Sequence, residues 1–142
     1  MKNLLSILSF VSFLILSSCS EKKVEPIHFG KDQCELCKMG IEDAKFGTEL
    51  ITEKGRVYKF DDIQCMVKYH KENSTTKIQS FYIHDFNENN SLIAAETAHY
   101  IKDGEINSPM RGNIIATQTK EEAQKLAENF KATATSWSEI IK

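Results

Sequence analysis

The chain has 142 residues, with 18 basic and 20 acidic side chains and a formal net charge of −2. This length predicts a single domain. Nearly all of the lysines are spread singly along the sequence, which excludes the basic patch that nucleic-acid binding requires. Hydrophobic residues make up 41% of the chain, enough for a modest packed core. We therefore expect one folded domain with no nucleic-acid partner.

Residues 1–18 have the pattern of a secretory signal. Lys2 gives a positive start, residues 4–16 are almost uninterruptedly apolar, and small residues precede Cys19. The apolar run is shorter than the roughly twenty residues that a membrane-spanning helix needs. Residues 16–19 read Leu-Ser-Ser-Cys and resemble the bacterial lipobox, which implies cleavage before Cys19 and lipidation of its sulfur. The alternative is an ordinary cleaved signal that a cysteine happens to follow.

The segment after the signal is expected to tether the domain to a membrane. Residues 19–33 would form the lipidated N-terminus and tether, because the stretch from Ser20 to Glu25 is polar. Several acyl chains supply stable anchoring that one chain does not. Ser20 does not argue for retention at the inner membrane, so we expect a periplasmic protein anchored to the outer membrane.

Alternating apolar residues and turn signals predict the first half of the domain, residues 34–91. A strand over residues 46–52, a turn and a strand over residues 56–60 form a hairpin. Asp61 is expected to cap a helix over residues 62–72. A strand over residues 77–85 should follow.

The second half, residues 92–142, repeats this plan loosely. The sequence predicts strands over residues 92–95, 99–101 and 112–117, a helix that begins at the capping box of residues 119–122, and a last strand over residues 134–140. Hairpin, helix and strand thus occur twice. The expected fold class is α+β, built from two similar, treble-clef-like halves.

Sulfur-bearing residues gather at the start of the first half. Cys34, Cys37 and Met39 lie within six residues, and Cys65 falls in the first turn of the predicted helix. Such soft donors select Cu(I), and thiolate also suits zinc. A Cys-x-x-Cys loop, a hairpin and a helix-borne cysteine match the order of a treble-clef metal knuckle. The alternative is a disulfide between Cys34 and Cys37, with Cys65 as a small buried side chain.

Methionines favour copper over zinc in this cluster, because a thioether is a good Cu(I) ligand and a poor zinc ligand. Met39 and Met110 are the better candidates, since Met66 lies on the predicted apolar face of a helix. With Cys19 lipidated, three thiols remain, an odd number that disulfides cannot fully pair. A closed zinc site would need a fourth ligand, for which the candidates are His28, His70, His84 and His99.

The chain resembles the NosL family, the accessory lipoproteins of nitrous oxide reductase. The motifs that carry the resemblance are Cys19, Cys34-x-x-Cys37-x-Met39-x-Ile41, Phe60-Asp61-Asp62-Ile63-Gln64-Cys65-Met66, Tyr82-Ile83-His84-Asp85, Ala98-His99-Tyr100-Ile101 and Ser108-Pro109-Met110. They occur in order over nearly the whole mature chain. The family usually has Met-Gly at the last motif, whereas Arg111 follows Met110 here.

The resemblance implies a Cu(I) chaperone, not an enzyme, that serves the copper centres of nitrous oxide reductase together with an ABC-type transporter. Met110 is the first family ligand to carry over. A homodimer that shares the ion is left open. The first half also resembles TRASH-type heavy-metal knuckles, which makes a zinc-stabilised binding or sensing module the alternative. A thiol oxidoreductase is disfavoured, because residues 34–40 do not offer a helix that begins at Cys34.

Overall fold

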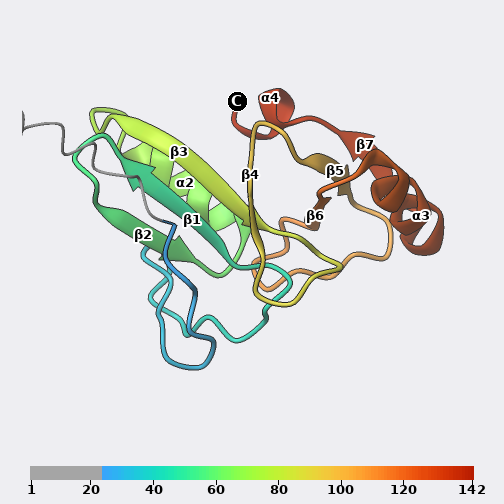
Figure 1. Cartoon of the computed structure of the whole chain (residues 1–142), viewed down its shortest axis with the longest axis horizontal. Helices are drawn as coiled ribbons and strands as arrows, with labels where there is room; N and C mark the ends of the chain where they lie inside the picture. Colours follow the sequence, from blue (N-terminus) through green and yellow to red (C-terminus); the bar gives the residue numbers. More distant parts are fainter. Residues whose placement is uncertain (1–23) are drawn as a thin grey trace, which may run out of the picture.

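The structure is a computed structural model, and it describes residues 24–142 (Figure 1). The predicted signal peptide, the lipidation site Cys19 and the first residues of the tether lie outside the described residues. Within the described range, no helix combines the length and the apolar character needed to cross a membrane.

The first half forms an antiparallel sheet with one long helix. Strand β1 (Thr48–Thr52) pairs with β2 (Val57–Phe60) in a hairpin, and β1 also pairs with β3 (Ile78–His84). Helix α2 (Ile63–Glu72) connects β2 to β3. The predicted hairpin, helix and strand are therefore confirmed.

The second half forms a smaller antiparallel sheet. Strand β5 (His99–Lys102) lies between β6 (Ile114–Thr117) and β7 (Thr133–Thr135), and helix α3 (Lys120–Phe130) connects β6 to β7. Thr119 caps α3 in a capping box with Glu122, as the sequence predicts.

The two sheets share one connectivity. The strand orders are β2-β1-β3-β4 and β6-β5-β7, so in each half the first strand is central, its antiparallel partner lies on one side and the strand after the helix on the other. This match confirms the α+β class and the two similar halves. Strand β4 (Leu92–Ala94), where the second half was expected to begin, pairs with β3 and extends the first sheet.

Two local predictions are wrong. The expected strand over residues 134–140 is only β7, because Ser136 starts a short helix, α4 (Trp137–Ile140), whose Glu139 side chain accepts from the Ser136 amide at 3.1 Å. The cap of α2 is Asp62 and not Asp61, since the Gln64 amide donates to Asp62 Oδ1 at 2.8 Å.

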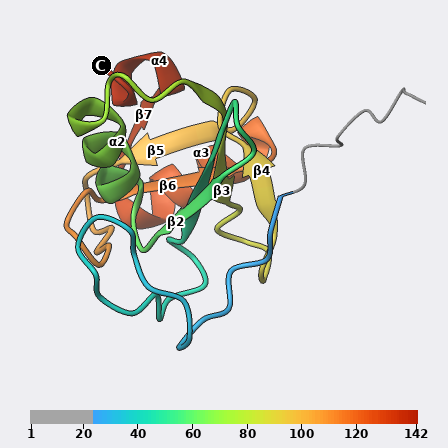
Figure 2. The same ribbon diagram turned by 90° about the vertical axis from the view of Figure 1, so that its left-hand side faces the viewer.

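The faces of the first sheet are covered in different ways. Helix α2 packs on the face that carries Leu50 and Phe60, and its Met66 is completely buried there. On the opposite face the chain before β1 crosses the strands: the Glu25 amide donates to Glu49, and Lys59 Nζ donates to the Pro26 carbonyl at 2.9 Å. Figure 2 shows α2 and this N-terminal segment on opposite sides of β2 and β3.

Candidate metal centre

The Cys-x-x-Cys segment folds into a tight loop at the end of the first sheet. The Cys34 amide donates to the Met39 carbonyl at 2.8 Å, and the Lys38 amide donates back to the Cys34 carbonyl at 2.9 Å. Lys38 has φ +62°, which turns the chain sharply. The Glu35 amide donates to the Lys59 carbonyl at 2.8 Å, which docks the loop on β2. The local bonds thus fix both cysteines against the strand that leads to α2.

The strand-to-helix connection supplies the other half of the site. Strand β2 ends at Phe60, and Asp61 and Asp62 follow before α2 begins at Ile63. Cys65 therefore sits in the first turn of α2, where it faces the loop instead of solvent and is only 2% exposed. The structure has the knuckle, hairpin and helix order that the sequence analysis expected.

Three sulfurs and one carboxylate converge at this point. The Sγ atoms of Cys34, Cys37 and Cys65 and an oxygen of Asp61 all lie within 4.8 Å of one another. Cys34, Cys65 and Asp61 are buried, whereas Cys37 is partly exposed. All three cysteines are free thiols, so the expected alternative of a Cys34–Cys37 disulfide is not what the structure has. Such a donor set suits a soft or borderline metal ion.

The thiols do not share their protons equally. The hydrogen bond from Cys65 lowers the pKa of Cys34 to about 6, against the opposing effect of burial. Burial raises the pKa of Cys37 to about 11, and the hydrogen bond to Cys34 together with burial raises the pKa of Cys65. Cys34 is therefore the cysteine whose thiolate form the metal-free site favours most: Cys65 donates toward it, whereas Cys37 donates to Asp61. A metal ion would displace the remaining protons, because thiolate is the ligating form.

Asp61 is the site residue that the sequence reasoning assigned to another role. Its Oδ2 accepts a hydrogen bond from Cys37 Sγ at 3.5 Å, and its Oδ1 is buried with no hydrogen-bond partner. A buried carboxylate oxygen without a partner is costly, and coordination to a cation would satisfy it. The sequence did contain a signal for this role, because Asp61 and Asp62 are consecutive acids: a helix needs only one cap, so one of the two is available for the site.

The methionines occupy three different environments. Met39 is 49% exposed at the rim of the loop, and Met66 is fully buried in the core. Met110 is partly buried and packs against the core cluster that contains Cys34 and Cys65, and its amide donates to Asp62 Oδ2 at 3.0 Å. The loop between β5 and β6 thus brings Met110 to the start of α2, where it contacts Asp62. The roles of Met39 and Met110 as ligands remain predictions.

None of the histidines joins this cluster, although all four lie in the described range. His84 is buried on the other face of the first sheet, where its Nδ1 lies 2.8 Å from the Gly47 carbonyl. His70 packs against the Phe81 ring, and His28 and His99 are exposed. The fourth donor that a closed zinc site would need is Asp61, where the sequence analysis considered only histidine.

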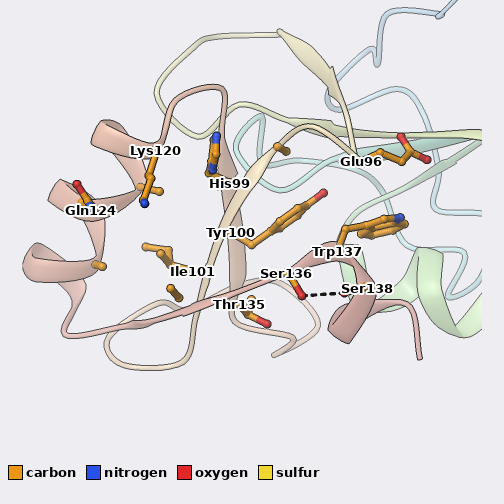
Figure 3. A pocket seen from close by; sticks show the side chains of 14 residues that line it. Glu96, His99, Tyr100, Ile101, Lys120, Gln124, Thr135, Ser136, Trp137 and Ser138 are labelled. Carbon is orange, nitrogen blue, oxygen red and sulfur yellow. Dashed lines mark hydrogen bonds between the residues drawn. The ribbon is translucent and has the colours of Figure 1, made fainter.

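A separate cavity of about 560 Å³ lies in the second half, between β5, α3 and α4. Figure 3 shows Lys120 and Gln124 of α3 on one side of it and Trp137 on the other, with β5 between them. The Tyr100 and Trp137 rings stack there with centroids 6.0 Å apart. No cysteine or methionine lines this cavity, so it is distinct from the thiol cluster.

Comparison with solved structures supports the same fold. The crystal structure of the copper chaperone NosL from Shewanella denitrificans matches with a TM-score of 0.72 at 19% sequence identity. The match covers 83% of this chain and 95% of that chain. At this level of identity the likeness shows a shared fold.

Comparison of sequences identifies the family. A search of curated proteins found no match. The NosL family model matches residues 26–142, which includes the whole expected domain of residues 34–142 and the end of the expected tether, and this match confirms the resemblance carried by the motifs. The chain therefore belongs to the NosL family.

Proposed function

We propose that this protein is a lipid-anchored, periplasmic Cu(I) chaperone that delivers copper for the maturation of the metal centres of nitrous oxide reductase. It carries out no catalysis of its own. Family membership and the fold shared with a copper chaperone support the copper-binding role. The anchor at Cys19, the outer membrane, nitrous oxide reductase and an ABC-type transporter are carried over from the lipobox and from the family resemblance.

One observation carries the proposal. The thiols of Cys34, Cys37 and Cys65 converge within 4.8 Å at the edge of the domain, and the cluster is closed on one side by buried atoms and open on the other at Cys37. Thiolate sulfur holds Cu(I) firmly. The partly exposed Cys37 and the exposed Met39 leave a side from which the sulfur of a partner protein can replace a ligand. Firm binding with one accessible side is what a metal carrier needs.

The binding part of the proposal is tested by titration. The full chain, purified from membranes in detergent without oxygen, is titrated with Cu(I) against a competing chelator. We expect one Cu(I) per chain, and a loss of affinity of about tenfold or more on replacing Cys37 by Ser, because a metal ligand is lost. Met66→Leu is the matched control, since this methionine is buried in the core. Equal affinity for the unchanged protein and the Cys34→Ser, Cys37→Ser double variant would refute the copper site.

The delivery part needs a separate test in cells. Deletion of the gene is expected to leave nitrous oxide reductase deficient in copper, and the unchanged gene should restore the copper content, whereas a Cys37→Ser gene should not. Cys19→Ser should release the protein from the membrane fraction. Full copper loading of the reductase in the deletion strain would reject the delivery role while leaving copper binding intact.

A zinc-stabilised, TRASH-like binding or sensing module is the second candidate. The observation that favours it is Asp61, which completes a set of four donors of the kinds that zinc accepts, three thiolates and one carboxylate. This candidate predicts one zinc ion per chain after purification without added metal, and unfolding when a chelator removes it. Elemental analysis of the purified protein separates it from the copper chaperone.

A further inference from the structure

We propose that Asp62 is a positioning residue that holds the Met110 loop against the start of α2 and so sets the place of the Met110 thioether beside the thiol cluster. The inference rests on the proposed copper binding, because it concerns how one predicted ligand is presented. It goes beyond that proposal in assigning a role to a residue that is not a ligand.

The evidence begins with two hydrogen bonds to one carboxylate. Asp62 Oδ1 accepts from the Gln64 amide at 2.8 Å, which caps α2, and Asp62 Oδ2 accepts from the Met110 amide at 3.0 Å. Asp62 is only 1% exposed, so water does not compete effectively for either oxygen. Each oxygen of the side chain therefore has a different partner, and the two partners come from different halves of the chain.

The Met110 loop is built to make this contact. The Asn113 amide donates to Ser108 Oγ at 2.8 Å, and the Ser108 amide donates to Asn113 Oδ1 at 3.3 Å, which closes the loop on itself. Arg111 and Asn113 have φ of +58° and +50°, in the left-handed region that costs free energy for residues other than glycine. The hydrogen bonds between Ser108 and Asn113 thus hold the loop around Met110 in a strained backbone conformation.

Gly112 permits the close approach of this loop to α2. A Cβ at this position would lie 2.7 Å from Asp62 Oδ1 and 2.9 Å from Gln64 Cβ, closer than van der Waals contact allows. The backbone at Gly112 therefore passes directly over the first turn of α2. Close approach and the two hydrogen bonds together place the Met110 backbone at a fixed position relative to Cys65, which lies in the same turn.

One carboxylate consequently links the two parts of the proposed copper site. It fixes the first turn of α2, which carries Cys65, and it fixes the amide of Met110 on the β5–β6 loop. Loss of the second bond would leave the thiols in place and free the thioether to move. Outer residues that orient a metal ligand typically change metal affinity by about 10–100-fold when they are replaced.

The test uses Asp62→Asn, which keeps the size of the side chain and a good helix cap but has only one acceptor oxygen. In the full-length protein without metal, we expect faster hydrogen exchange of the Met110 amide, because its acceptor is lost. With Cu(I), we expect an affinity about tenfold or more below that of the unchanged protein, and a copper X-ray absorption spectrum with one sulfur fewer.

A double-variant comparison shows whether Asp62 acts through Met110. Met110→Leu removes the thioether at nearly constant volume, and the combination with Asp62→Asn should bind Cu(I) no more weakly than Met110→Leu alone. Thr119→Ala is the matched control, because it removes the cap of α3 far from the site. It should lower the free energy of unfolding and leave Cu(I) affinity unchanged. Gly112→Ala provides a second way to displace the loop if Asp62→Asn fails to fold.

The outcomes separate this inference from the proposed function. If the unchanged protein does not bind Cu(I), both are overturned. If it binds, but Asp62→Asn or Gly112→Ala binds equally tightly with the same number of sulfur ligands, the positioning role alone is overturned. Additive losses for Asp62→Asn and Met110→Leu would likewise overturn it, since the two residues would then act independently.

Discussion

Cys37 donates a hydrogen bond from its Sγ to Asp61 Oδ2 over 3.5 Å. This bond joins the Cys-x-x-Cys loop, residues 34–39, to the residues just before α2, 24 positions further along the sequence. This contact is between the partly exposed thiol of the cluster and the carboxylate whose other oxygen has no partner. It places a hard donor inside a group of soft donors. The choice of metal therefore depends on whether Asp61 coordinates the ion or only accepts from Cys37.

Replacing Asp61 by Asn is expected to separate these two roles. The change keeps the shape of the side chain and removes its charge. We expect zinc affinity to fall by about tenfold or more, because zinc loses a carboxylate ligand. Cu(I) affinity should change much less, because Cu(I) prefers the three sulfurs. Competition titrations with both metals, on the same preparation, measure the difference. A Cu(I) affinity that falls as far as the zinc affinity would show that the carboxylate is essential to either ion.

Replacing Met66 and replacing Met39 should affect different properties, stability in the first case and Cu(I) transfer in the second. Met66→Leu is a volume-conserving change in the core, for which we expect a cost below about 1.5 kcal/mol and no effect on Cu(I) binding. Met39→Leu should hardly change stability, since the side chain is half exposed. If Met39 takes part in release, its loss should slow the transfer of Cu(I) to an added chelator. Equal transfer rates for the two variants would remove Met39 from the proposed site.

Much of the fold was predictable because its signals are local. The hairpin of β1 and β2 follows from alternating apolar residues around a glycine turn, and α3 follows from the Thr119 capping box. The convergence of Cys34, Cys37 and Cys65 was also predictable, since a loop, a hairpin and a helix start leave little choice of geometry. The α+β class and the repeated connectivity follow because the sequence predicts the order hairpin, helix and strand twice.

The parts that the sequence did not predict depend on contacts between distant residues. Nothing near Asp61 indicates that its neighbour Asp62 would cap the helix, because the choice depends on the backbone at the end of β2. The bond between Asp62 and the Met110 amide spans 48 residues and depends on the shape of the β5–β6 loop. The division of the last segment into β7 and α4 was also not predicted, because three or four residues are too few to show the periodicity of a strand or a helix.

A pair of glycines tests how closely the β5–β6 loop approaches the end of α3. Gly104 has φ +62°, and a Cβ there would lie 2.2 Å from the Phe130 carbonyl oxygen at the end of α3. Gly55 has φ +79° in the β1–β2 turn, with nothing near the place of a Cβ. Gly55→Ala should therefore cost only backbone strain, about 1–2 kcal/mol. Gly104→Ala should cost clearly more, because backbone atoms must also move. Chemical denaturation measures both, and equal losses would contradict the close approach.

Glu49 should make the stability of the protein depend on pH. It is completely buried on the face of β1 covered by the N-terminal segment, its Oε1 accepts from the Glu25 amide at 3.2 Å, and its Oε2 has no partner. Burial raises the pKa of this carboxyl from 4.5 to about 7. The folded protein therefore binds more protons than the unfolded chain between these two values. The contribution of the neutral carboxyl is fully present below the unfolded pKa and is lost as the pH rises through about 7.

Glu49→Gln is the variant that isolates this effect. Glutamine is neutral at every pH and keeps an oxygen that can accept from the Glu25 amide. One unit of pKa corresponds to about 1.4 kcal/mol, so the gain in the free energy of unfolding should approach about 3 kcal/mol above pH 7 at most. Near the unfolded pKa of 4.5 the gain should vanish. Glu53→Gln on the exposed β1–β2 turn is the control and should show no such trend. Urea unfolding at several pH values measures the free energy of unfolding of both proteins. If the difference between Glu49→Gln and the unchanged protein stays constant with pH, Glu49 is already ionised in the folded state and the prediction is wrong.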